Sequence, residues 1–242
     1  MKSHNFVVFD CETGGLDKKN NFHAITVPIT GIALVGLKAT TLEEIDRYSG
    51  YIKGRYANNQ YIGYSTLHDQ LYQDGAVKAT GITREILEEK GKDYKVVCNE
   101  IISFFEKCDA GDRYKKTILV GHNVVYDIPF LQYLFKLCKK DLSKYIEGYY
   151  NHETQFTPVF FDTQFLSRAK SIDENQKHNL LEVTTREGFE LIDAHDAMND
   201  TLATSEIFKK YIRTLRSSQE ASNGNIMSEE KVDYRSNFKF EY

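Results

Sequence analysis

The feature of this sequence that most restricts its fold is the alternation of short apolar runs with segments of helical periodicity. The runs that have the length and flanking residues of strands are 6–9, 29–37, 48–52, 117–120 and 159–161. Helical spacing is found in a stretch that begins at Thr83 and at 94–108, 125–138, 178–188 and 197–215, whereas 56–80 is expected to be mostly loop. This order predicts one α/β domain on a mixed, mostly five-stranded sheet flanked by helices.

The periodic pattern ends near residue 216. At 242 residues, the chain has the length of one domain or at most two. Residues 1–216 are therefore predicted to form the domain, and the polar, aperiodic residues 217–242 are predicted to form a flexible tail. Aromatic residues among the polar ones of this tail leave two interpretations open: a spacer, or a peptide that folds on a partner protein.

Composition excludes several classes of protein. Hydrophobic residues make up 41% of the chain and charged residues 27%, with 3 prolines, which excludes collagen-like and wholly disordered chains. No apolar run approaches the ~18 residues of a membrane span, and the run at 6–9 is too short to be the core of a signal peptide. The 4 cysteines are scattered, with no Cys-x-x-Cys pair. These observations predict a cytoplasmic protein with reduced thiols and no membrane partner.

Two acids, Asp10 and Glu12, end the first predicted strand. Side chains two residues apart on a strand point to the same face, about 6.5 Å apart along the chain, so Cys11 between them points to the opposite face. Two neighbouring acids can be buried only when cations or protons neutralise them, and hard divalent ions with oxygen ligands are the usual solution. Taken alone, the pair fits an exposed strand end better than a metal site.

Two further acids stand at the starts of predicted helices. Asp127 follows the strand at 117–120 and is expected in the first turn of the next helix, where Asn123 could serve as the cap. Asp200 is expected in the first or second turn of the last helix, with His195 in the loop before it. Together with the first pair, these acids favour a cluster of carboxylates that holds metal ions.

In this order, Asp10 with Glu12, then Asp127, then His195 with Asp200 resemble the three motifs of DnaQ-like, or DEDDh-type, 3′–5′ exonucleases. The resemblance extends over roughly residues 5–215. The family includes the proofreading epsilon subunit of bacterial DNA polymerase III. It implies a ribonuclease H-like fold, two Mg²⁺ or Mn²⁺ ions held by the four acids, and His195 as a general base that takes a proton from the attacking water.

The resemblance also implies contacts with the terminal nucleotide. The residues that match family positions for such contacts are Thr13, Gly14, Gly15, Leu16, His122, Asn123 and Tyr126. Leu16 would act as an apolar wedge against the terminal base, whereas Tyr126 fits helix packing equally well. Thr80 stands where the family carries a histidine, which leaves the usual contact to the 3′ end open.

The expected function is therefore that of a metal-dependent 3′–5′ exonuclease. It would act in DNA replication or repair on single-stranded or frayed 3′ ends of DNA and release nucleoside 5′-monophosphates. An RNA-trimming exoribonuclease stays open, because the same metal cluster serves either sugar. A non-catalytic module that binds nucleic acid, or binds a DNA polymerase through the tail 217–242, is the other alternative. The net charge of −4 does not exclude a polyanionic substrate, because metal ions would neutralise four of the acids.

Overall fold

The computed structural model describes residues 4–16, 23–109, 116–152, 154–171 and 175–225. The chain divides into two compact units, Met1–Phe208 and Lys209–Tyr242. The expected tail lies outside the described residues from 226 onward, and the expected domain boundary at residue 216 stays a prediction. None of the described helices combines the length and apolar character needed to cross a bilayer.

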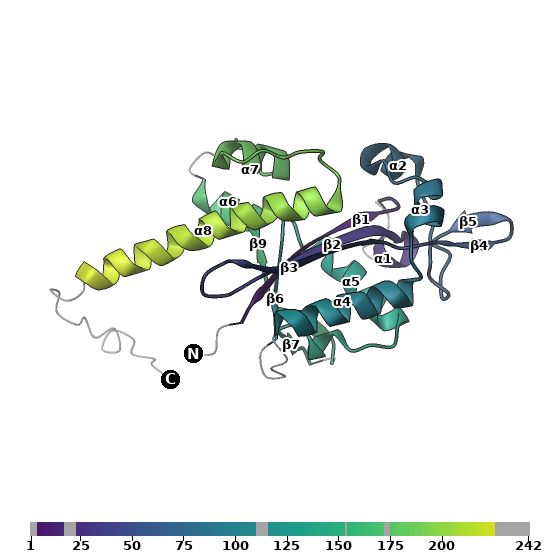
Figure 1. Ribbon diagram of the computed structural model, residues 1–242, viewed down its shortest axis with the longest axis horizontal. Coiled ribbons are helices and arrows are strands. Elements are labelled where there is room, and N and C mark those ends of the chain that lie inside the picture. The colour runs from purple at the N-terminus through teal and green to yellow at the C-terminus, as the bar shows by residue number, and fades with distance from the viewer. Residues whose placement is uncertain (1–3, 17–22, 110–115, 153, 172–174, 226–242) are drawn as a thin grey trace, which may run out of the picture. The chain divides into compact units, whose positions relative to one another are not determined.

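A five-stranded mixed sheet forms the centre of the first unit (Figure 1). In sheet order, its strands are β3 (Glu44–Tyr51), β2 (Ile29–Leu37), β1 (Phe6–Thr13), β6 (Ile118–Gly121) and β9 (Phe160–Asp162). The β1–β2 and β2–β3 pairs are antiparallel, whereas β1–β6 and β6–β9 are parallel. The mixed five-stranded sheet predicted from the sequence is confirmed.

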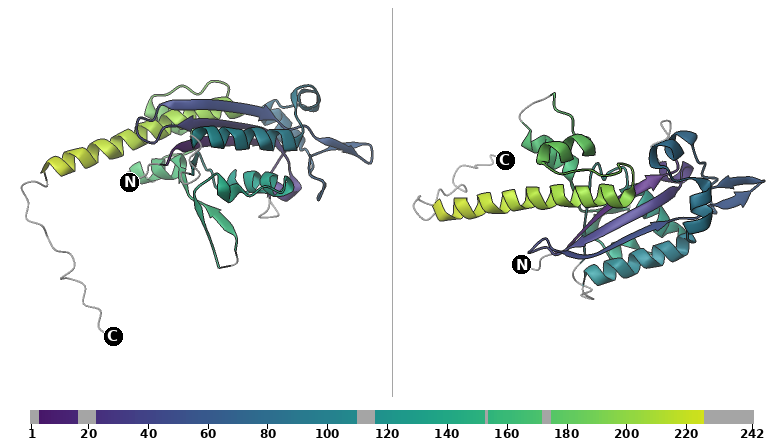
Figure 2. Two further views of the ribbon diagram at one scale, coloured as in Figure 1. Left: turned by 60° about the horizontal axis from the view of Figure 1, so that its bottom comes forward. Right: turned by 45° about the horizontal axis from the view of Figure 1, so that its top comes forward.

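Helices flank this sheet. They are α1 (His23–Thr26), α2 (Asp74–Thr80), α3 (Arg84–Lys90), α4 (Tyr94–Cys108), α5 (Ile128–Leu137), α6 (Thr163–Lys170), α7 (Leu180–Glu187) and α8 (Ala197–Asn225), with a 3₁₀ helix η1 (Leu142–Lys144). The predicted bounds of α4 are confirmed. In the right view of Figure 2, α4 and the start of α8 lie on opposite sides of the sheet.

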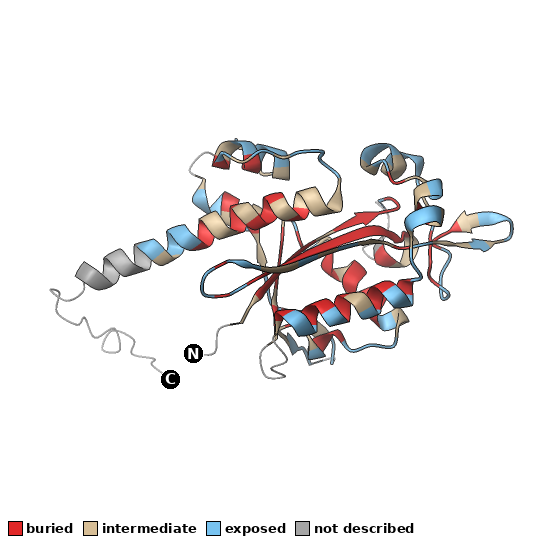
Figure 3. Cartoon of the chain, viewed as in Figure 1, coloured by how far each residue is buried: buried red, intermediate tan, exposed pale blue. Residues whose placement is uncertain are grey.

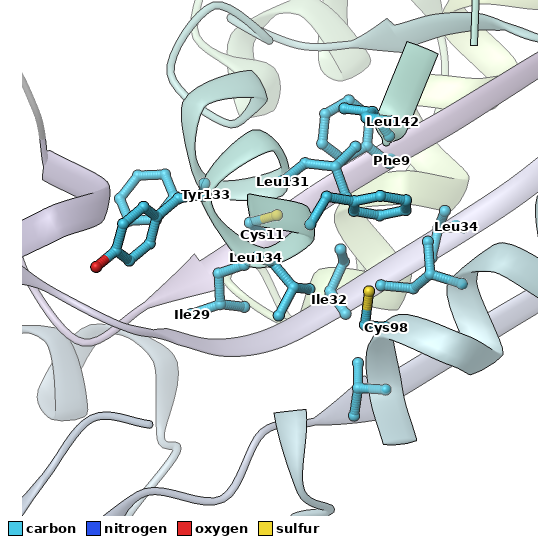
Figure 4. Packing of buried hydrophobic residues seen from close by; sticks show 14 of the residues in the cluster. Phe9, Cys11, Ile29, Ile32, Leu34, Cys98, Leu131, Tyr133, Leu134 and Leu142 are labelled. Atoms are coloured by element: carbon cyan, nitrogen blue, oxygen red, sulfur yellow. The ribbon is translucent and has the colours of Figure 1, made fainter. Parts of the chain in front are cut away.

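Strand β1 is buried on both faces, which follows from its apolar sequence (Figure 3). Val7, Phe9 and Cys11 belong to the core cluster that also includes the inner residues of α4 and α5 (Figure 4). On the other face, the ring of Phe6 packs edge-on against Phe208 of α8, with 4.9 Å between ring centroids. The alternation along β1 therefore directs Asp10 and Glu12 to the face that α8 covers.

The region from 55 to 80 differs from the expected loop. It contains a hairpin of β4 (Arg55–Ala57) and β5 (Gln60–Ile62), followed by α2. Asn58 and Asn59 both have positive φ, 50° and 61°, as the two central residues of a type I′ hairpin turn require. A second hairpin, β7 (Gly148–Tyr150) with β8 (Phe156–Pro158), and helix α6 were also not expected.

Candidate active site

Strand β1 carries the first two acids inside its length. Its ladder pairs Asp10 with Ala33 and Glu12 with Gly31, so that only small side chains of β2 stand beside the carboxylates on this face. A Cβ on Gly31 would lie 3.6 Å from the Cβ of Glu12. Cys11 points into the opposite core and is 7% exposed, as predicted from the alternation (Figure 4).

Asp127 occupies the N-cap position of α5, yet its side chain makes no capping bond. Its carboxylate instead accepts a hydrogen bond from the backbone of Cys11, and the residue is only 4% exposed. Asn123 was expected to cap α5, and this expectation is wrong. Asn123 adopts a φ of 61° and donates its backbone N–H to Oδ1 of Asp162 at 3.0 Å. The turn therefore leaves the Asp127 carboxylate free to face β1.

Asp200 lies in the first turn of α8, and His195 lies in the loop before that helix. The backbone N–H of His195 donates to Oδ2 of Asp200 at 3.3 Å, while Oδ1 of Asp200 is buried and has no hydrogen-bond partner among the described residues. Ligand atoms of Glu12, His195 and Asp200 lie within 4.8 Å of one another. Asp196 caps α8 by accepting hydrogen bonds from two backbone N–H groups.

The four acids interact with one another electrostatically. Burial, followed by the charge of Asp200, raises the pKa of Asp10 to about 7. Burial, followed by the charges of Asp10 and Asp200, raises the pKa of Glu12 to about 8. Burial, followed by the charge of Asp10, raises the pKa of Asp127 well above its usual range, and burial also raises the pKa of Asp200. The fold therefore brings the acids from β1, α5 and α8 into one cluster.

This cluster fits divalent cations. Ionised carboxylates at such close range repel one another, and burial deprives them of the water that would screen the repulsion. Oxygen ligands are those that Mg²⁺ and Mn²⁺ prefer, and the unpartnered Oδ1 of Asp200 has the chemistry of such a ligand. The residues present can thus hold divalent metal at the end of β1.

The raised pKa values predict how the stability of the metal-free protein depends on pH. In the unfolded chain, Asp10 and Glu12 lose their protons near their ordinary pKa values of 3.8 and 4.5. The folded chain keeps these protons to higher pH, because both pKa values are raised. The free energy of unfolding should therefore fall by several kcal/mol, in order of magnitude, as the pH rises from about 4 to about 8. Saturating Mg²⁺ or Mn²⁺ should restore most of this loss.

Thermal unfolding in EDTA and in excess metal, measured across this pH range, checks the prediction. The difference in melting temperature between the two conditions should be larger at pH 8 than at pH 5. Equal differences at both pH values would contradict the mutual repulsion of the acids.

A cleft of about 810 Å³ adjoins the carboxylates. Glu12 and His195 line it together with Thr13, Gly15, Leu16 and Tyr126, and the facing wall is the side of α2 that carries Ala76, Ala79 and Thr80. Four of the seven residues expected to contact substrate therefore lie in its wall. Gly14 is instead packed against Pro28, since a Cβ on it would lie 2.9 Å from that ring.

The turn that carries Leu16 is held by side chains from distant segments. The amide of Gln73 donates from Nε2 to the backbone oxygen of Leu16 at 2.9 Å and accepts from its N–H at 3.1 Å. The hydroxyls of Thr13 and Tyr126 both donate to the backbone oxygen of Gly15. Leu16 is thereby fixed with 54% of its surface exposed at the rim of the cleft. Sequence reasoning missed Gln73, because nothing in its surroundings in the chain marks this partner.

His122 does not line this cleft. Its ring nitrogens lie 2.9 Å from Oγ1 of Thr163 and 2.9 Å from the backbone oxygen of His178, and burial lowers its pKa. It therefore links the end of β6 to α6 and to the segment before α7. Asn123 is exposed beside it and likewise lies outside the cleft wall.

Thr80 uses its hydroxyl within its own segment. Oγ1 donates to the backbone oxygen of Ala76 at 3.0 Å and accepts from the N–H of Ile82 at 3.1 Å. The side chain therefore lines the cleft without a free donor.

Comparisons with known proteins identify relatives of this arrangement. A family model described as exonuclease (RNase_T) matches residues 7–208. The PolC-type DNA polymerase III of Staphylococcus aureus (strain bovine RF122 / ET3-1) is 27% identical over 219 residues, which are 89% of this chain and 12% of that protein.

Solved structures share the fold. The zinc-bound complex of E. coli exonuclease I with single-stranded DNA superposes with a TM-score of 0.63 and 23% identity, over 89% of this chain and 42% of that one. Its complex with a dT13 oligonucleotide gives a TM-score of 0.63 and 22% identity, over 91% and 43%. The chain thus spans less than half the length of these relatives.

Proposed function

Because the chain belongs to the exonuclease family of the RNase_T model, we propose that it is a metal-dependent 3′–5′ exonuclease that releases nucleoside 5′-monophosphates from DNA. The observation that carries the proposal is the cluster of Asp10, Glu12, Asp127 and Asp200, which opens through Glu12 onto a cleft with His195 at its edge. A module that only binds nucleic acid would not need buried acids that repel one another.

Each part of the site has a role in the proposed reaction. The four acids would hold two Mg²⁺ or Mn²⁺ ions, which would supply activation of water and neutralisation of charge on the phosphoryl group. His195, exposed in its loop, accepts the proton of the attacking water. Leu16, fixed by Gln73, separates the terminal base from the next one, and the backbone at 13–15 contacts the terminal nucleotide.

DNA is the proposed substrate because structures of E. coli exonuclease I, which share this fold, contain single-stranded DNA. The match to a polymerase of the PolC type favours association with a replicative polymerase, with a cytoplasmic location.

Oligonucleotides of matched sequence test this function. A single strand of DNA labelled at its 5′ end should shorten stepwise with retention of the label, and the same strand labelled at its 3′ end should release a labelled mononucleotide at once. The reaction should require Mg²⁺ or Mn²⁺, stop in EDTA and proceed faster on DNA than on RNA. Release of the 5′ label first would refute the polarity, and faster degradation of RNA would favour the exoribonuclease.

A further inference from the structure

Helix α6 exposes its one aromatic side chain, Phe165, to solvent. Phe165 is 74% exposed, the highest value among the large apolar side chains that the structure describes. The buried residues of this helix are instead polar. Thr163 donates to the backbone oxygen of Gly121 at 3.1 Å, and the Ser167 hydroxyl lies 2.9 Å from Nδ1 of His178. Hydrogen bonds thus anchor the helix, and its packing against the domain does not require an apolar side chain at the exposed position of Phe165.

Phe165 stands next to the turn that carries Asp127. Its backbone N–H points to Oδ1 of Asp162 at 3.4 Å, and the N–H of Asn123 donates to the same oxygen at 3.0 Å. Asp127 belongs to the turn that begins at Asn123, since its backbone N–H donates to the backbone oxygen of Val124 at 3.0 Å. In the same turn, Val125 is 59% exposed. Phe165 and Val125, here called the apolar rim, are therefore exposed beside the turn that carries Asp127.

The apolar rim meets the cleft at the turn that carries Val125, because Tyr126 of this turn lines the cleft. The turn at 13–16 and α2 form other parts of the cleft wall, whereas β9 and α6 follow β6 at the far edge of the sheet from β3. A strand whose terminal nucleoside occupies the cleft places its scissile phosphate at the carboxylates. The nucleotides before it must then leave along another flank.

The side of α6 that carries Phe165 also carries a positive charge. Arg168 follows it by three residues, which places both on one side of the helix, and Arg168 is exposed. An exposed aromatic ring beside an arginine is typical of surfaces that hold single strands, since every base has a face that can stack and every phosphate carries a negative charge.

We propose that Phe165 is a stacking platform for a base upstream of the scissile bond, and that Arg168 contacts the adjoining phosphate. This inference rests on the proposed exonuclease function and names the path of the substrate strand within it. The site would act on strand affinity rather than on the chemical step, because it touches no reacting atom.

Two substrates separate this inference from the function on which it rests. Oligothymidylate dT12 extends past the rim, whereas the p-nitrophenyl ester of thymidine 5′-monophosphate has no upstream nucleotide. Phe165→Ala should lower kcat/KM for dT12 roughly 5- to 150-fold through KM, as expected for the loss of one stacked base, and leave hydrolysis of the ester unchanged. Phe165→Trp should retain most of the activity on dT12.

Two further variants complete the design. Tyr149→Ala removes another aromatic side chain, which is 60% exposed in the β7–β8 hairpin. This variant should leave kcat/KM unchanged for both substrates. Arg168→Ala should reduce the slope of log KM for dT12 against log salt concentration by about 0.7, the value for one lost phosphate contact of a single strand.

Unchanged kcat/KM of Phe165→Ala on dT12 would overturn the inference, and so would an equal loss on both substrates, which would mean that the residue supports the fold of the site. If the unmodified protein hydrolyses neither substrate in Mg²⁺ or Mn²⁺, the proposed function itself fails.

Discussion

Replacement of Asp127 by Asn should lower kcat for release of the terminal nucleotide by about 10³-fold and, in EDTA, make the protein more stable. The loss follows because a carboxylate that binds metal contributes several kcal/mol to stabilisation of the transition state, and each 1.36 kcal/mol is tenfold in rate. The gain follows because the neutral amide removes repulsion from Asp10 and Glu12 at a residue that is only 4% exposed. The amide oxygen can still accept the hydrogen bond from the backbone of Cys11.

Single-turnover hydrolysis of dT12 and thermal unfolding in EDTA at pH 8 measure the two effects. The melting temperature should rise by about 2–4 °C for each kcal/mol of repulsion removed. Asp93→Asn is the matched control, since Asp93 is the N-cap of α4 and its side chain accepts from the backbone N–H of Lys95. This control should leave both quantities unchanged. A fall in both activity and metal-free stability of Asp127→Asn would mean that the acid supports the fold rather than the metal.

The elements that carry the four acids could be predicted because their signals are local, whereas a shared metal site was implied by the resemblance to the exonuclease family. Two acids at a spacing of two on a strand must share a face, and Asp127 and Asp200 each stand at a helix start that the periodicity of the chain marks. The sheet could be predicted for the same reason, since short apolar runs and short links set which strands are neighbours.

Residues that act through distant partners could not be predicted. Gln73 holds Leu16 across 57 residues of sequence, and His122 is bound by Thr163 and His178 from segments that follow it by 41 and 56 residues. Helix α6 was not predicted because its buried residues are polar. The periodic spacing of apolar residues that indicates an amphipathic helix is therefore absent from this segment. The hairpin at Asn58 and Asn59 did carry a signal, since paired residues that tolerate positive φ indicate a tight turn.

Replacement of His195 by Asn should lower kcat by roughly 10²- to 10⁴-fold, the range for loss of a general base. Asparagine is the better substitution because His195 has a φ of 72°, a conformation that Asn adopts more readily than Ala. The hydrogen bond from the backbone of residue 195 to Asp200 does not depend on the side chain and should persist.

Metal affinity decides what this loss means. A nitrogen of His195 lies within 4.8 Å of ligand atoms of both Glu12 and Asp200, a distance that also suits a metal ligand. If His195 is the base, calorimetry should give the same affinity for Mn²⁺ in His195→Asn as in the unmodified protein, because oxygen ligands of the four acids hold the ion. A loss of affinity that parallels the loss of kcat would instead assign His195 to the metal and leave the attacking water without this base. His68→Asn, which alters an exposed histidine in the loop after β5, should change neither quantity.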